Sequence, residues 1–162
     1  MSSNFSAVNP KVVSTPSPQG LPLRYMLAED SKTWKKGELG YMTSGTVSPV
    51  ATTTGSGEPC LVFAEDQATS TSSTSVWVRL LQPETRLEIY VTNNGTDAAV
   101  GVANLNVAYE VYGLSNVTYL DVGATTAPDF VVEKLAADYE PERNATADTP
   151  GKCIVVYRPL SA

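Results

Sequence analysis

The residues that most often carry out catalysis are scarce in this chain. It has no histidine, which excludes Ser-His-Asp and Cys-His catalytic groups and histidine-based zinc or iron sites. Cys60 and Cys153 are the only cysteines, too few for a four-thiolate metal site. Both lie in apolar runs, where a thiol most often packs as a small hydrophobic group, although a disulfide between paired strands stays open.

Carboxylates offer another route to catalysis, but their spacing argues against it. Glu65 and Asp66 are adjacent, so on a strand their side chains point to opposite faces and cannot act as a pair. Glu84 and Glu88 could meet other carboxylates only across strands, and we interpret them as solvated acids at strand edges. We therefore predict that the protein is not an enzyme.

Known ligand-binding motifs are also missing. The run "TTTGSG" at residues 52–57 has glycines, but no Lys-Ser/Thr follows it, and we interpret it as a hairpin or surface loop. Asp97 and its neighbours Asn93 and Asn94 lack the spaced acids of a calcium loop. Trp34, Trp77 and the tyrosines could form a sugar-stacking platform, but aromatic residues on strands are more often core or interface residues. We expect no cofactor and no metal.

Composition narrows the class of protein further. The chain has 162 residues, of which 42% are hydrophobic, enough for a core. Its net charge of −6 argues against a nucleic-acid-binding protein, which needs a basic surface. It has neither an apolar run near the length of a membrane span nor a signal-peptide pattern, so we expect a soluble protein made in a cytoplasm.

The elements that must position any site are strands. Alternating apolar and polar residues mark "SVWVRLL" and "RLEIYVT", which we predict to be a hairpin joined by the turn "QPET" at residues 82–85. Asn94-Gly95 marks a loop, after which come three further strand-like runs, "NVAYEVYGL", "NVTYLDVG" and "CIVVYRPL". The segment Phe130–Leu135 fits a strand or a helix capped by Asp129, with the paired valines favouring the strand. Together the runs predict an all-β fold, a small barrel or sandwich of about eight short strands, over residues 24–162.

Residues 1–23 predict a separate, extended N-terminal arm. Four prolines, Pro10, Pro16, Pro18 and Pro22, exclude a helix and argue against an inner strand. Apolar residues nevertheless recur along the arm, spaced like anchors for a partner surface. Lys11 and Arg24 are the only charged residues in the first 24, in a chain that is otherwise strongly acidic.

The segment "KKGELGYMTSGTVSPVATTTGSGEPCLVFAED", residues 35–66, resembles the entry segment of the head decoration, or cement, proteins of tailed bacteriophages. In that family a charged turn around a Lys-Gly pair leads into a strand and a glycine turn, and a second strand ends in an acidic pair. "SVWVRLLQPETRLEIYV" resembles the hairpin that follows, and "DFVVEKLAADYEPERNATADTPGKCIVVYRPL" the closing strand pair. The similarity extends over about residues 23–160; the long arm and residues 93–123 depart from the smaller members.

The resemblance implies a structural protein on the outer surface of the mature capsid. It would bridge neighbouring subunits of the major capsid protein, itself assembled as a trimer or, alternatively, a dimer, and stabilise the expanded shell. The implied capsid-binding arm residues are Phe5, Val8, Lys11, Val12, Val13, Leu21, Leu23 and Arg24. The implied oligomer or capsid interface residues are Trp34, Lys35, Lys36 and Tyr41.

Other interpretations stay open. The arm could be solvated or could pack on its own domain, and Trp34 could cap the barrel. The whole chain could be another virion component, such as a head fibre, neck or tail protein, or a carbohydrate-binding β-module.

Overall fold

The computed structural model describes residues 6–50, 59–126, 128–140, 142–143 and 149–159. This part of the chain is almost entirely β-structure, which confirms the predicted all-β class. It contains twelve strands rather than about eight, because the arm and the turns contribute short strands that the sequence pattern did not mark. The strands are β1 (Lys11–Ser14), β2 (Leu23–Leu27), β3 (Leu39–Thr43), β4 (Thr46–Pro49), β5 (Leu61–Phe63), β6 (Ser75–Leu80), β7 (Arg86–Asn93), β8 (Thr96–Asp97), β9 (Ala108–Leu114), β10 (Val117–Asp121), β11 (Phe130–Leu135) and β12 (Lys152–Tyr157). Two short 3₁₀ turns are η1 (Val102–Asn104) and η2 (Ala136–Asp138).

Five strands close into a barrel. The order β7-β10-β9-β11-β12 returns to its start because β12 also pairs with β7. The first half of β7 lies between β1 and β12, and its second half pairs in parallel with β10. Leu87, Ile89 and Val91 alternate along β7 and are fully buried, as their spacing predicted.

Tight turns set the register of two hairpins, β7–β8 and β9–β10. Asn94 and Gly95 join β7 to β8 with φ angles of 50° and 94°. Ser115 and Asn116 join β9 to β10 with φ angles of 51° and 61°. Two consecutive residues at positive φ match the twist of antiparallel strands, so both hairpins have two-residue connections.

Strands β2 to β6 form a second sheet of order β2-β6-β5-β3-β4. A bridge between Ala28 and Val47 links its two ends, and the Glu29 amide donates a 2.9 Å hydrogen bond to the Val47 carbonyl. The sheet encloses a small core of its own, in which Trp34 stacks on Phe63 with ring centroids 4.6 Å apart.

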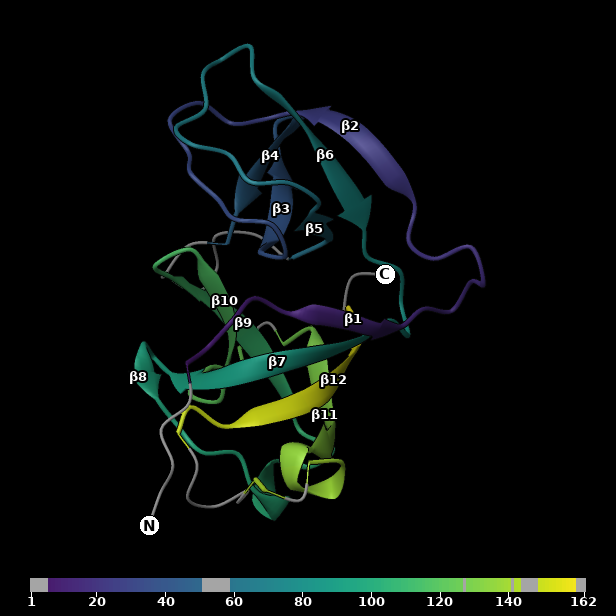
Figure 1. Cartoon of the computed structure of the whole chain (residues 1–162), viewed down its shortest axis with the longest axis vertical. Helices are drawn as coiled ribbons and strands as arrows, with labels where there is room; N and C mark the ends of the chain where they lie inside the picture. The colour runs from purple at the N-terminus through teal and green to yellow at the C-terminus, as the bar shows by residue number, and fades with distance from the viewer. Residues whose placement is uncertain (1–5, 51–58, 127, 141, 144–148, 160–162) are drawn as a thin grey trace.

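The two β-units lie one above the other in Figure 1, and they share one hydrophobic cluster. Leu39 and Val62 of the second sheet belong to the same cluster as Leu87 and Leu120 of the barrel. A hydrogen bond crosses the boundary from the Leu39 amide to Thr118 Oγ1, at 3.0 Å. The hydroxyl of Tyr157 donates a second one to the Pro59 carbonyl, at 2.9 Å. Apolar burial and hydrogen bonds therefore hold the two units together.

One predicted pairing is wrong. The runs at residues 75–81 and 86–92 do form strands, but β6 pairs with β2 and β5, whereas β7 pairs only with strands of the barrel and with β1 and β8. The turn at residues 82–85 is the crossing point between the two units instead of a hairpin turn. The open choice at Phe130–Leu135 resolves to a strand, β11, paired with β12 and β9.

The N-terminal arm lies along its own chain in the described structure. Residues 11–14 form β1 beside β7, and Leu21 is buried in the shared cluster. Phe5 lies outside the described residues. Cys60 and Cys153 are not joined in a disulfide: Cys153 is buried in β12, and Cys60 lies half-buried just before β5.

Candidate functional site

An exposed apolar surface lies on the outside of the second sheet. It consists of Leu23, Tyr25 and Leu27 on β2 and Trp77 on β6, and we call it the aromatic face. Their side chains are 42%, 60%, 41% and 43% exposed, respectively. Tyr25 is the register partner of Trp77, and their ring centroids are 4.8 Å apart at an interplanar angle of 45°.

The aromatic face follows from strand alternation. Met26, Val76 and Val78 point inward and pack in the core of the second sheet, so their neighbours along the strand must point outward. Outward positions on a strand are usually polar, whereas four large apolar side chains gather at these. Arg24 alternates with these residues along β2, and its guanidinium donates to the Leu23 carbonyl at 3.0 Å. Grouped exposure of this kind marks an interaction surface.

A second feature is an open groove of about 630 Å³ between the arm and the edge of the barrel. We call it the lysine groove. Three segments far apart in the sequence line it: Ala7–Lys11, Lys35–Gly37 and Ser115–Val117.

Asn9 holds these three segments together. Its Nδ2 donates to the carbonyls of Asn116, at 3.0 Å, and of Lys36, at 3.4 Å. Its Oδ1 accepts from the Thr118 amide, at 3.0 Å. Gly37, at φ +93°, lies so close that an added Cβ would be 3.0 Å from the Asn9 Cβ, so the close approach suits glycine.

The charges of the lysine groove are of one sign. Lys11, Lys35 and Lys36 are exposed, no lining residue is acidic, and none of the three lysines forms an ion pair with another described residue. Hydrogen bonds to two acidic side chains hold the turn that carries Lys35 and Lys36. The Lys36 amide donates to Asp66 Oδ1 at 2.7 Å, and the Lys35 amide donates to Glu38 Oε2 at 2.5 Å. Burial raises the pKa of Glu38 to about 7, and the hydrogen bond from Lys35 only partly offsets that effect.

The structure brings together five of the predicted interface residues at these two places. Val8, Lys11, Lys35 and Lys36 line the lysine groove. Leu23 belongs to the aromatic face, whereas Arg24, the next residue on β2, is exposed outside it.

The other predicted interface residues lie elsewhere. Val13 is exposed on β1, while Val12 and Tyr41 are half-buried in their strands. The predictions for Leu21 and Trp34 are corrected: both are buried in hydrophobic cores, so neither side chain is open to a partner.

Two parts of these surfaces were not predicted from the sequence. Tyr25 and Leu27 carry a usable signal, because "LRYML" alternates apolar residues at the start of the domain. The turn at residues 115–117 carries none, because its place beside Asn9 depends on contacts more than 100 residues apart in the sequence.

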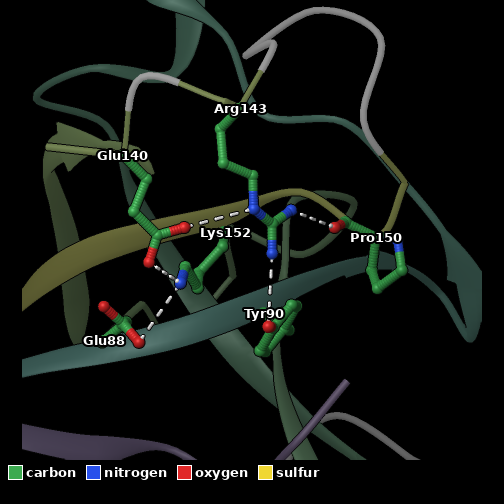
Figure 2. Close-up of polar contacts among 6 residues, drawn as sticks. All are labelled: Glu88, Tyr90, Glu140, Arg143, Pro150 and Lys152. Carbon is green, nitrogen blue, oxygen red and sulfur yellow. Dashed lines mark hydrogen bonds and ion pairs between the residues drawn. The ribbon is translucent and has the colours of Figure 1, made fainter. Parts of the chain in front are cut away.

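Charged side chains also gather between β7, β12 and the loop after η2 (Figure 2). Lys152, 7% exposed, makes ion pairs with Glu140 and, at 3.5 Å, with Glu88. Arg143 lies 3.4 Å from Glu140 and donates to the Tyr90 hydroxyl at 3.2 Å and to the Pro150 carbonyl at 3.3 Å. Because these charges neutralise one another and are largely shielded from water, the cluster serves to fix the loop on the barrel.

The described residues bring no three His, Cys, Asp or Glu side chains together as a metal site. Burial raises the pKa of the Cys153 thiol, which disfavours its reactive thiolate form. In the same part of the chain, no helix has the length and apolar character needed to cross a membrane.

Comparison with known proteins gives no match: no family model fits the chain, and no curated protein or solved structure is detectably similar to it.

Proposed function

We propose that this chain is a structural protein that binds the outer surface of a mature phage capsid and stabilises it by bridging neighbouring subunits of the major capsid protein. The observation that carries the proposal is the aromatic face, where four exposed large apolar side chains gather on two neighbouring strands. Burying what remains exposed of each of its four side chains in an interface contributes roughly 1 kcal/mol. The choice of a capsid as partner rests on the resemblance of residues 35–66 to head decoration proteins.

Bridging requires two binding surfaces on one molecule. The aromatic face is built on β2 and β6, whereas the lysine groove is built from the arm, the Lys35–Gly37 turn and the β9–β10 turn. A clamp of this kind stabilises an expanded shell by mass action if it binds that state alone. Repetition over a lattice makes weak contacts effective together.

Co-sedimentation of the purified full chain with mature heads that lack it tests the proposal. We expect wild-type protein to sediment with mature heads, and the double variant Tyr25→Ala, Trp77→Ala to stay in the supernatant. Met42→Ala is the matched control, because Met42 is 51% exposed on β3, outside the aromatic face. Wild-type protein that does not bind heads, or face variants that bind as well as wild type, would overturn the proposal.

Carbohydrate binding is a second candidate function, favoured by the paired exposed rings of Tyr25 and Trp77. A glycan array separates the two functions: glycan binding that Trp77→Ala abolishes, without binding to heads, supports the carbohydrate-binding module. If the chain does occur in virions, copy number distinguishes hundreds of decoration proteins from the few copies of a neck or tail component.

A further inference from the structure

The lysine groove is a second binding surface with its own chemistry. Its lining combines the cationic side chains Lys11, Lys35 and Lys36 with the apolar residues Val8, Pro10 and Val117. A ligand that matches this lining offers both negative charge and small apolar groups.

A group of three lysines is unusual in this chain, because the chain as a whole is acidic. The whole chain has a net charge of −6, with 17 acidic and 11 basic residues. Three of those basic residues face one groove in which no lining residue is acidic. In the described structure their ammonium groups are left without an internal carboxylate partner, in contrast to Lys152 in its buried cluster.

Hydrogen bonds hold the segments that line the lysine groove in place. Asn9 bonds to backbone atoms from two other segments, and Asp66 and Glu38 bind the amides of the turn that presents two lysines. The walls are therefore positioned before a ligand arrives, which lowers the entropy cost of binding.

We propose that the lysine groove binds an extended, acidic segment of a partner protein, whose carboxylates pair with Lys11, Lys35 and Lys36. The open shape suits an extended backbone, and the apolar surface suits small side chains between the carboxylates. Nucleic acid fits less well, because its dense negative charge would be repelled by the acidic remainder of the molecule. The inference does not require the partner to be a capsid; if the proposed function holds, the segment belongs to the capsid surface.

Fluorescence anisotropy with a labelled peptide of alternating glutamate and valine tests this proposal on the full chain. We expect the wild type to bind the peptide, with an affinity that falls as salt rises. The triple variant Lys11→Glu, Lys35→Glu, Lys36→Glu should bind at least about tenfold more weakly, since three exposed ion pairs are replaced by repulsion. Val8→Asp should weaken binding in the same direction.

The control is the double variant Lys32→Glu, Lys134→Glu, which reverses charge outside the groove and should bind within about twofold of the wild type. Circular dichroism checks that each variant remains folded. Absence of peptide binding by the wild type, an equal loss in the control, or tighter binding of a single-stranded oligonucleotide than of the peptide would each overturn the proposal. Because the peptide assay uses no capsid, its result is independent of the co-sedimentation result.

Discussion

At the scale of single residues, Glu38 links the lysine groove to pH. The residue is 3% exposed, and burial raises the pKa of its carboxyl group from 4.5 to about 7. A carboxyl whose pKa is higher in the folded than in the unfolded protein binds its proton more tightly when folded. Its contribution to stability is therefore complete below about pH 4.5 and is lost as the pH rises through 7.

Glu38→Gln should remove this dependence, because glutamine stays neutral and keeps an oxygen to accept from the Lys35 amide. We expect the variant to gain stability relative to the wild type between pH 4.5 and pH 8, by roughly 3 kcal/mol for a pKa shift of this size. Urea unfolding of both proteins at several pH values measures the difference. A difference that stays constant across the range contradicts the assignment.

Lys152 tests whether the charged cluster in Figure 2 stabilises the fold. Lys152→Met keeps an unbranched stem but leaves Glu88 and Glu140 without their shared cation. We expect a loss of about 3 kcal/mol in the free energy of unfolding at pH 7. Lys134→Met, at an exposed position on β11, should change it by no more than about 0.5 kcal/mol.

The cost of Lys152→Met should shrink at low pH. The hydrogen bond from Lys152 lowers the pKa of Glu140, so this pair stabilises the fold above the unfolded pKa and loses that effect as the pH falls. Urea unfolding at pH 7 and at pH 4 measures both costs. Equal costs at the two values would show that packing of the lysine stem, and not its charge, matters.

At the scale of elements, the strands could be predicted but their partners could not. Alternation marked β6 and β7 because burial on one face imposes a period of two, and Leu87, Ile89 and Val91 obey it. The same alternation says nothing about which strand lies alongside. The turn at residues 82–85 looks like a hairpin turn, yet Leu81 before it is buried where the two units meet, which sends the chain into the barrel.

For the candidate surfaces too, the sequence predicts local features but not the contacts between distant segments. Lys35 and Lys36 were predicted from the resemblance of the charged turn at the start of residues 35–66, and that signal is local. Trp34 beside them was predicted as an interface residue, but a large aromatic side chain fills a small core equally well, and here it stacks on Phe63. Sequence patterns identify which residues are unusual; burial, which depends on distant strands, decides which of them face a partner.

At the scale of the whole molecule, the shared cluster predicts that the two β-units unfold together. Leu39 is fully buried in it, and its amide donates to Thr118 of the barrel. A unit that unfolded alone would expose the apolar side chains of the other, so separate unfolding is costly.

The two tryptophans provide a direct measurement of this coupling. Trp34 and Trp77 both belong to the second sheet and its core, so their fluorescence reports on that unit, whereas far-ultraviolet circular dichroism reports on the whole fold. In wild-type protein we expect both signals to change at the same urea concentration. Leu39→Ala should shift both midpoints downward together, at a cost of about 2–5 kcal/mol. Leu114→Ala, at a position 37% exposed on β9, is the control and should shift neither by much. A circular-dichroism transition that persists after the fluorescence change is complete would show that the barrel is stable on its own, and that the contact between the units is not part of one cooperative core.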